Sequence, residues 1–330
     1  MRVLYIYRNP GMGISIGKVF RPIEDAMKTH CEVESIYLPA VGYSLKSLWR
    51  NVQFVIKSQK LQKCDVVHIT GTESYLLPFL KRHKVLFTVH DIASLETNCS
   101  GLKRMFKRRA FIETIKYADF VTFISQKSMH ETLDAISLEL SRVKVIENPL
   151  ERSYKFSPRE FNVSLPTILH VGTKPNKNLS RSVEALKGIA CRLRIVGVLS
   201  SQQKEELDRS GIDYSNVWNI SDQQMLEEYK ECDIVNFPST YEGFGMPIVE
   251  GQAVGRVVVT SQIEPMKSVG GKGVVLVDPY SVDSMRKGYE SIIEDKSLRD
   301  ATISMGVKNS ERYDLYRITK EYFEIYKGEL

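Results

Sequence analysis

Glu242 and Glu250 are separated by seven residues that begin with a glycine-rich turn. The turn reads Gly243, Phe244, Gly245, Met246 and Pro247. A carboxylate can accept two hydrogen bonds from neighbouring hydroxyls, such as those of a sugar or a ribose. Two carboxylates at this spacing could therefore hold both halves of a nucleotide sugar. For either glutamate alone, the alternative is a solvated acid that the helix dipole favours at a helix start.

The elements around this turn should aim it at a ligand. Residues 233–237 form an apolar run that predicts a buried parallel strand directly before the turn. Gly243 and Gly245 lack side chains, so backbone N–H groups can approach a ligand closely. Pro247 suits the first turn of a helix, where its missing N–H costs nothing. A strand, a glycine turn and a helix N-terminus together present amides and a positive dipole end to an anion or polar ligand.

A second candidate motif lies earlier in the chain and carries positive charge. A predicted strand at residues 168–171 runs into Gly172 and Thr173, and Lys174 and Lys177 follow. A nucleoside diphosphate that leaves its sugar carries negative charge, which fixed cations stabilise. We expect Lys177 to supply such a cation, with Gly172, Thr173 and Lys174 beside the same group. The alternative is an ordinary solvated lysine, which a nearby helix N-terminus would disfavour.

These two motifs resemble those of the family 4 retaining glycosyltransferases, over residues 167–279. The resemblance implies the GT-B fold, an α/β architecture of two Rossmann-like domains whose parallel sheets face a central cleft. It also implies retaining transfer of a sugar from a nucleotide diphosphate donor, either a UDP-sugar or a GDP-sugar.

The resemblance also implies roles for single residues. Glu242 and the loop amides after it would hold the donor sugar, and Glu250 would hold the ribose. Lys177 matches the family lysine, so Lys177 and Glu242 are expected to be catalytic. Thr173 stands where the family often has an arginine, which leaves Lys174 as the neighbouring cation.

A histidine and an aspartate, His90 and Asp91, follow the apolar run at residues 85–89. Side chains at the carboxyl ends of parallel strands face the crevice in which open α/β sheets bind ligands. A lone histidine is more often structural, but the resembled family has a His-Asp pair here whose histidine meets the transferred sugar. We therefore expect His90 to be catalytic and Asp91 to lie on the acceptor side. Ser125, which follows the run at residues 120–124, could line the same cleft.

A glycine-rich loop at residues 9–17 follows the first predicted strand. Such a loop before a helix can cradle a phosphate, and we expect Gly13 to contact the donor diphosphate. A plain turn is the alternative. The glycines also suggest a dinucleotide site, but the second strand ends at residues 37–39 without the acid that would take a ribose hydroxyl.

Apolar runs alternate with helical stretches along the chain, which predicts parallel sheets with right-handed crossovers. In the first half the expected strands are residues 3–7, 33–38, 66–69, 85–89, 120–124 and 143–146. In the second half they are residues 168–171, 193–196, 217–220, 234–237, 257–260 and 274–277. Prolines between residues 147 and 166 predict the linker. We expect an acceptor-binding domain at residues 1–155 and a nucleotide-sugar domain at 156–312. A C-terminal helix at 313–330 would pack back on the first domain, as in the resembled family.

Two segments of the first half combine basic and apolar side chains. Residues 44–63 should form a helix whose apolar face contains Leu45, Leu48, Trp49, Val52, Val55 and Ile56. Its basic residues are Lys46, Arg50, Lys57, Lys60 and Lys63. The second segment contains Lys103, Arg104, Lys107, Arg108 and Arg109 around Met105 and Phe106. Such segments favour an anionic membrane surface. The alternative is a surface helix whose apolar face packs in the core.

The 330 residues, of which 42% are hydrophobic and 26% charged, are typical of a globular protein with two domains. No run is long enough to span a bilayer, and the apolar start at residues 3–7 is too short for a signal peptide. Five scattered cysteines without a Cys-x-x-Cys pair predict a reducing compartment and no zinc site. The net charge of +6 permits an anionic ligand, and we expect no nucleic-acid partner. The expected location is cytoplasmic, or peripheral on the inner face of the plasma membrane.

The chain contains no Asp-x-Asp, the usual ligand motif for a metal that clamps a diphosphate. We therefore expect no cofactor and a metal-independent reaction, in which Lys177 and helix dipoles replace the metal. Together with the resemblance, this predicts a retaining, hexosyltransferase-like glycosyltransferase. It would move a sugar to a glycan or lipid-linked acceptor in surface polysaccharide synthesis. A sugar-nucleotide epimerase on the same fold and an NAD-dependent dehydrogenase are the alternatives.

Overall fold

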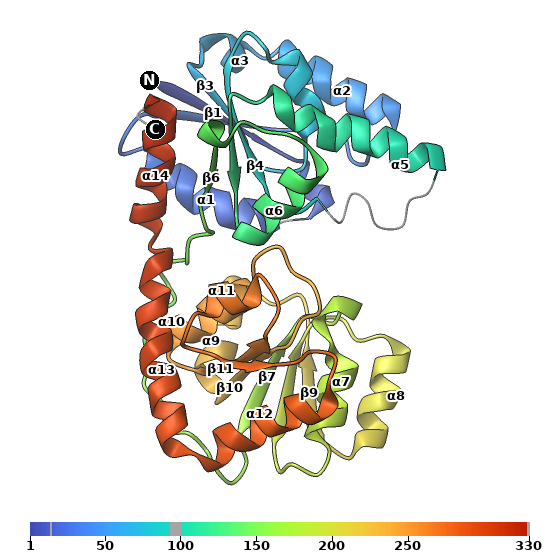
Figure 1. Ribbon diagram of the computed structural model, residues 1–330, viewed down its shortest axis with the longest axis vertical. Helices are drawn as coiled ribbons and strands as arrows, with labels where there is room; N and C mark the ends of the chain where they lie inside the picture. Colours follow the sequence, from blue (N-terminus) through green and yellow to red (C-terminus); the bar gives the residue numbers. More distant parts are fainter. Residues whose placement is uncertain (14, 93–100, 329–330) are drawn as a thin grey trace. The chain divides into compact units, whose positions relative to one another are not determined.

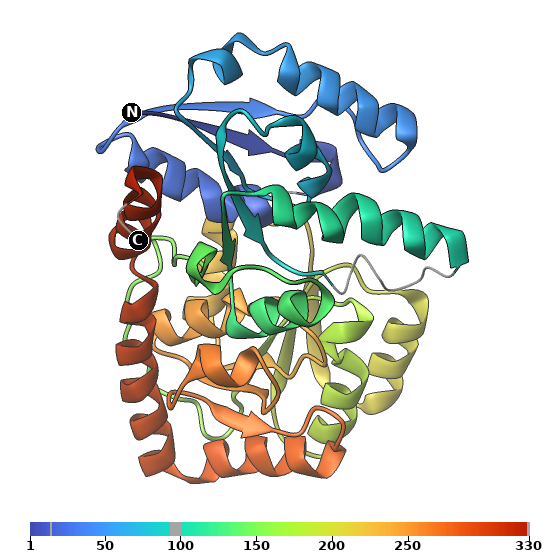
Figure 2. The same cartoon turned by 45° about the horizontal axis from the view of Figure 1, so that its top comes forward.

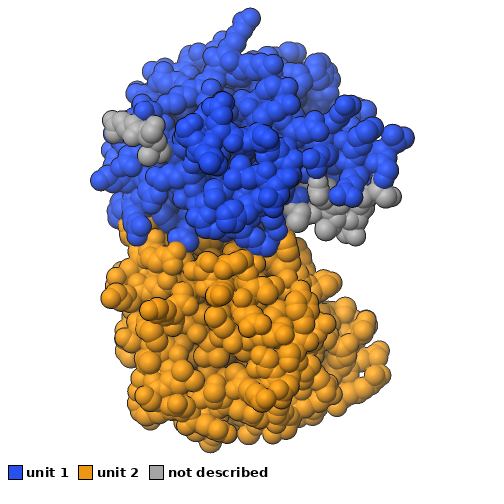
Figure 3. All heavy atoms as spheres, in the orientation of Figure 1, with its two compact units in different colours: residues 1–149, 315–330 blue, residues 150–314 orange. Residues whose placement is uncertain are grey.

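The computed structural model describes residues 1–13, 15–92 and 101–328. The chain forms two compact units, one of residues 1–149 with 315–330 and the other of residues 150–314 (Figure 3). The first boundary lies before the expected position after residue 155. Near this boundary, the N–H of Leu150 donates to the carbonyl of Tyr313 over 2.8 Å, which joins the first and last segments of the second unit.

The first unit contains one parallel sheet, with six strands in the described residues. The strands are β1 (Arg2–Tyr7), β2 (Glu32–Tyr37), β3 (Val66–Ile69), β4 (Lys84–Val89), β5 (Phe120–Phe123) and β6 (Val143–Val145). Their order is β2-β1-β3-β4-β5-β6. The direction of winding therefore reverses between β1 and β3, and such a switch point is where open α/β sheets bind ligands.

Helices cover both faces of this sheet (Figures 1 and 2). On one face, α1 (Ser15–Met27) and the C-terminal α14 (Leu315–Lys327) share a cluster of buried apolar side chains. On the other face lie α2 (Leu45–Ile56), the short helix η2 (Ser74–Phe79) and η3 (Arg108–Ile112). His68 is buried between β3 and α14, where its ring hydrogen-bonds to Tyr326 and Thr88. His68 therefore has a structural role in the core of the first unit.

The remaining helical elements of the first unit follow. They are η1 (Pro10–Met12), α3 (Gln59–Lys63), α5 (Gly101–Lys107), η4 (Glu113–Tyr117), α6 (Gln126–Ala135) and η5 (Leu140–Arg142). The basic segment expected as one helix at residues 44–63 is thus divided into α2 and α3, because Ser58 between them is in an extended conformation.

The second unit also contains one parallel sheet, again with six strands in the described residues. The strands are β7 (Thr167–Val171), β8 (Arg192–Val196), β9 (Asp213–Val217), β10 (Ile234–Phe237), β11 (Val257–Ser261) and β12 (Val275–Val277). Their order is β12-β11-β10-β7-β8-β9, so the winding reverses between β7 and β10. This is the doubly wound order of Rossmann-like domains.

Helices flank this second sheet as well (Figure 1). One cluster of buried side chains joins α7 (Leu179–Leu186), α8 (Ser201–Ser210) and α12 (Val282–Glu294) to the sheet. On the other face, Gly251 of α10 (Met246–Val254) lies so close that a Cβ there would come within 2.8 Å of Val235. The other helical elements are η6 (Pro175–Lys177), α9 (Asp222–Glu231), α11 (Met266–Gly270), α13 (Lys296–Ser310) and η7 (Glu311–Tyr313).

The strand expected at residues 217–220 was wrong, because β9 ends at Val217. β9 is an edge strand, and its half-exposed residues lack the continuous apolar run of a central strand. The apolar residues that suggested the strand lie in the turn after it, where Asn219 has a φ of 55° and Ser221 caps α9.

Candidate active site

Lys177 and Glu242 form an ion pair at the switch point of the second sheet. Lys177 ends η6, which follows β7, and Glu242 lies in the turn after β10, the neighbouring strand. The Lys177 Nζ lies 2.6 Å from Oε1 of Glu242. Their side chains are only 19% and 15% exposed, so water screens the pair less than it screens a surface pair. The two candidate motifs therefore meet in one site.

Gly172 makes room for the side chain of Lys177. It has a φ of +94°, a left-handed conformation that favours glycine. A Cβ at this position would lie 2.9 Å from Cγ of Lys177. The ammonium group also lies 4.5 Å from the centre of the Phe237 ring, at the end of β10, which adds a cation–π contact. The lysine is thus positioned by both strand ends.

Two asparagines that the sequence analysis did not single out join the two loops. The amide of Asn176 donates to Oε1 of Glu242 over 3.1 Å and to the carbonyl of Tyr241 over 2.9 Å. Asn178, with a φ of 65°, donates to the carbonyls of Pro238 and Pro279. Asparagine tolerates this left-handed conformation better than most residues, so the presence of Asn178 in the sequence was a sign of a turn at this position.

The second carboxylate, Glu250, lies on α10 and is also held by a residue that the sequence analysis missed. The Tyr229 hydroxyl donates to Oε2 of Glu250 over 2.6 Å. Burial raises the pKa of Tyr229 well above its usual value, so the phenol keeps its proton and remains a donor. α10 begins at Met246 after Gly245, whose φ is +122°. The helix has no side-chain cap, so its N-terminal dipole can act on a ligand.

Of three other predicted donor residues, two have structural contacts and the third is exposed. The Phe244 ring is buried and packs edge-on against Tyr313, so only the backbone of Phe244 could face a ligand. The Thr173 hydroxyl donates to the carbonyl of Val198 over 2.6 Å. Lys174 is exposed and takes no part in the Lys177–Glu242 pair.

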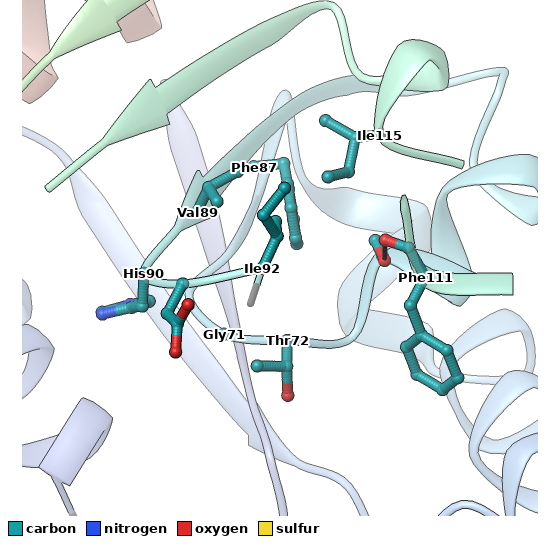
Figure 4. A pocket seen from close by; sticks show the side chains of 10 residues that line it. Gly71, Thr72, Phe87, Val89, His90, Ile92, Phe111 and Ile115 are labelled. Carbon is teal, nitrogen blue, oxygen red and sulfur yellow. Dashed lines mark hydrogen bonds between the residues drawn. The ribbon is translucent and has the colours of Figure 1, made fainter. Parts of the chain in front are cut away.

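In the first unit, His90 and Asp91 line a small pocket at the carboxyl ends of β3 and β4 (Figure 4). Gly71 and Thr72 form part of the same wall. The His90 Nε2 lies 2.8 Å from the carbonyl oxygen of Thr70. A carbonyl only accepts, so Nε2 carries the proton and Nδ1 is the acceptor. Burial lowers the pKa of His90 to about 4, so the imidazole is neutral at pH 7.

Ser125 and Gly13 do not line this pocket. The Ser125 hydroxyl accepts from the N–H of Ser128 and caps α6. Gly13 has a φ of +109°, and its carbonyl accepts from Nε of Arg8 over 3.2 Å. The loop after β1 forms the turn η1 (Pro10–Met12) before α1 begins.

Four cysteines, Cys31, Cys64, Cys191 and Cys232, are free thiols, and Cys99 lies outside the described residues. Within residues 1–13, 15–92 and 101–328, no group of three or more His, Cys, Asp or Glu side chains is arranged to hold a metal ion. Over the same ranges, no helix is both long and apolar enough to cross a membrane.

Residues 154–308 match the family model described as glycosyl transferases group 1. The second unit is a group 1 glycosyltransferase domain. The matched range contains Lys177, Glu242 and Glu250, together with the helices and the turn that carry them. The first unit, with His90 and Asp91, lies outside it.

The relatives of the chain that carries this group 1 glycosyltransferase domain are distant in sequence. Over 243 residues the chain is 26% identical to the O-antigen chain mannosyltransferase B of Escherichia coli, an alignment that covers 61% of this chain. It spans 63% of that relative and about a quarter of the length of related Escherichia coli mannosyltransferases named WbdA.

Solved structures show the fold of the whole chain. The structure of Anabaena HepE in complex with UDP and glucose has a TM-score of 0.78, with 20% identity, over 99% of this chain and 100% of that one. WaaG, a glycosyltransferase involved in lipopolysaccharide biosynthesis, has a TM-score of 0.76, with 16% identity and the same coverage. The expected fold class, GT-B, is therefore confirmed, since the chain has two α/β units that each contain a parallel sheet. The comparisons give no support to the epimerase or dehydrogenase alternatives.

Proposed function

We propose that this protein is a retaining glycosyltransferase that moves a sugar from a nucleotide diphosphate sugar to a glycan or lipid-linked acceptor. The observation that carries the proposal is the Lys177–Glu242 pair at the switch point of the group 1 glycosyltransferase domain. The pair places a fixed cation and a hydroxyl-binding carboxylate within 2.6 Å of each other, as a sugar bonded to a diphosphate requires.

The donor would lie across β7, β10 and the start of α10. Glu250 takes the ribose hydroxyls, with Tyr229 orienting its carboxylate. Glu242 and the backbone of residues 243–247 hold the donor sugar. Lys177 and the dipole of α10 lie beside the diphosphate, with Gly172, Thr173 and Lys174 at the same edge. HepE, which was solved with UDP and glucose, supports a UDP-sugar, and a GDP-sugar is the other donor to test.

In the reaction, the bond between the sugar C1 and the diphosphate oxygen breaks, and a bond from C1 to the acceptor oxygen forms on the same face. The acceptor proton passes to the departing phosphate oxygen. Lys177 stabilises the charge that develops on this leaving group. His90 is neutral, and its Nδ1 can accept a hydrogen bond from a hydroxyl of the transferred sugar. In this proposal Asp91 and Ser125 lie on the acceptor side, and Gly13 contacts the donor diphosphate.

Two observations support the proposed acceptor. The relatives act, by name, in O-antigen chain and lipopolysaccharide synthesis, which supports surface polysaccharide synthesis here. The basic and apolar helices α2 and α5 of the first unit would place the acceptor site at the anionic inner face of the plasma membrane. The donor would then be drawn from the cytoplasm.

The test begins with thermal unfolding in the presence of UDP, GDP, ADP and their sugars, because a ligand of the folded state raises its stability. We expect UDP or GDP compounds to raise the melting temperature. Transfer from a labelled donor, with NMR of the product, should then show the donor's anomeric configuration. An inverted product would contradict retention, an isomerised free sugar nucleotide would indicate an epimerase, and no nucleotide effect would overturn the proposal.

A further inference from the structure

The first unit has an open apolar groove with a volume of about 460 Å³ beside α2. From α2 it is lined by Leu45, Leu48, Trp49 and Val52. Leu48 and Val52 are buried and form its floor, whereas Leu45 is 71% exposed and Trp49 is 55% exposed. The apolar face expected for residues 44–63 is thus divided, with one half in the core and the other open.

The other two walls come from η2 and from the segment that continues α5. Tyr75, Pro78 and Phe79 of η2 form one wall, and the Phe79 ring packs edge-on against Trp49 at 6.2 Å between centroids. Phe106, Ala110 and Thr114 form the opposite wall. Figure 1 shows α2 and α5 at the same end of the sheet. The groove is therefore bounded by α2, by η2 and by the continuous segment of α5, η3 and η4.

The two hydroxyl groups of the groove, on Tyr75 and Thr114, already make hydrogen bonds within the protein. The Tyr75 hydroxyl accepts a hydrogen bond from the amide of Asn51 over 2.9 Å. The Thr114 hydroxyl donates to the carbonyl of Ala110 over 2.9 Å. A sugar or a peptide backbone in this groove would leave its own polar groups unpaired, which is costly. A hydrocarbon chain has no such groups, so it fits this lining.

Basic residues lie on two of the helices that line the groove. Lys46 and Arg50 lie on α2 and Lys103 and Lys107 on α5. None of these four has an ion-pair partner within residues 1–13, 15–92 and 101–328. Along α5, Leu102 is 81% exposed and Met105 is 52% exposed. Unpaired basic residues around exposed apolar side chains are complementary to an anionic lipid, whose phosphate and hydrocarbon chain lie next to each other.

We propose that this groove binds one hydrocarbon chain of an anionic membrane lipid, whose phosphate lies against the basic residues of α2 and α5. The proposal rests on the proposed transfer to a membrane-bound acceptor, and it adds a specific lipid site. Trp49 would then lie among lipid chains, deeper than surface attraction alone would bring it.

The test uses Trp49 as a reporter, since the chain contains only two tryptophans, Trp49 and Trp218. The Trp218→Phe variant leaves Trp49, and the Trp49→Phe variant leaves Trp218, which is exposed in the second unit. Each is mixed with vesicles of phosphatidylglycerol or phosphatidylcholine that carry brominated acyl chains, which quench nearby indoles. We expect strong quenching of Trp49 by phosphatidylglycerol vesicles and none of Trp218. Equal quenching of both, or none, would overturn the proposal.

Two further variants in the Trp218→Phe background separate the groove from the charge. Ala110→Phe fills the groove and should remove most of the quenching while the protein still sediments with anionic vesicles. If it unfolds, Leu45→Ser combined with Phe79→Ser replaces it, since both side chains are exposed. Replacement of Lys46, Arg50, Lys103 and Lys107 by Gln should lower vesicle affinity at least about tenfold. The matched control replaces Lys155, Lys204, Lys272 and Lys308 of the second unit, which are also exposed. This control should change the vesicle affinity little.

Two further measurements distinguish the possible causes of a negative result. Unchanged quenching in the groove variants would mean that the chain does not enter the groove. A concentration-dependent dimer that Leu45→Ser and Phe79→Ser abolish would identify a second copy as the occupant and would also overturn the proposal. Thermal shifts with UDP and GDP are recorded on the same samples. Nucleotide binding without quenching leaves the proposed function standing and rejects only the lipid site, whereas quenching without nucleotide binding rejects only the function.

Discussion

The ammonium group of Lys177 lies 2.6 Å from Oε1 of Glu242, although the two residues are 65 positions apart in the chain. Each follows a strand, and these two strands are neighbours at the point where the sheet order reverses. Without a ligand, each charge neutralises the other. A diphosphate would compete with Glu242 for Lys177, so the pair keeps both groups in place until the donor arrives.

Lys177→Met should lower kcat by about 10²–10³-fold, because it removes the cation beside the leaving group. The change also leaves Glu242 without its ionic partner in a largely buried position. Steady-state transfer assays measure the effect. Lys174→Met is the matched control, since Lys174 is exposed and lies outside the pair. An equal loss in both variants would show that the pairing with Glu242 has no special role.

Glu250→Gln should weaken the binding of free UDP or GDP by about 1.5–3 kcal/mol, the cost of a charged hydrogen-bond partner. Tyr229→Phe should weaken it by about 1 kcal/mol, because the phenol orients the same carboxylate over 2.6 Å. Glu242→Gln should leave nucleotide affinity nearly unchanged and reduce affinity for the whole nucleotide sugar. Isothermal calorimetry compares the three variants, and equal losses for Glu242 and Glu250 would contradict this division of roles.

Gly172→Ala should reduce donor binding and activity, which a stability loss from backbone strain alone would not explain. The new methyl group would lie 2.9 Å from Cγ of Lys177 and displace that side chain. The control is Gly188→Ala, which has a similar positive φ of +77° but no neighbouring atom within 4 Å. Both variants should lose about 1–2 kcal/mol of stability from backbone strain. If Gly188→Ala impaired donor binding equally, displacement of Lys177 would not explain the effect.

Glu73→Gln should stabilise the protein above pH 7. The Glu73 side chain is buried, its Oε2 has no hydrogen-bond partner among the described residues, and burial raises its pKa to about 7. Between the unfolded pKa of about 4.3 and this folded value, the folded state binds more protons than the unfolded state. The free energy of unfolding of the wild type therefore falls as pH rises through this window.

Because glutamine does not titrate, the variant should exceed the wild type by about 1–3 kcal/mol at pH 8 and match it near pH 4.5. Urea unfolding at both pH values measures the difference. Glu205→Gln, on an exposed part of α8, should follow the wild type at each pH. A constant difference between Glu73→Gln and the wild type at all pH values would show that the carboxyl group does not titrate as expected.

Transfer activity should persist in excess EDTA, because the chain lacks an Asp-x-Asp motif and Lys177 provides a cation at the proposed leaving group. Initial rates with EDTA, with added magnesium and with neither give the answer. If EDTA abolishes turnover and magnesium restores it, a metal takes part in the reaction.

The sequence alone determined the α/β class, most strands and the glycine turn before α10. These features arise from local patterns, because a buried parallel strand needs a continuous apolar run and a tight turn needs glycine. The edge strand β9 escaped this reasoning, since a half-exposed strand does not need such a run. The strand order, and with it the meeting of β7 and β10, could not be read from local sequence.

Tertiary structure alone decided which side chains meet. The Tyr229–Glu250 hydrogen bond joins α9 to α10, and Asn178 joins the end of η6 to two distant carbonyls. It also decided that Leu48 and Val52 are buried while Leu45 and Trp49, on the same helix, stay exposed. The pattern of a helix shows which residues share a face, but only the elements packed beside it determine how much of that face is covered.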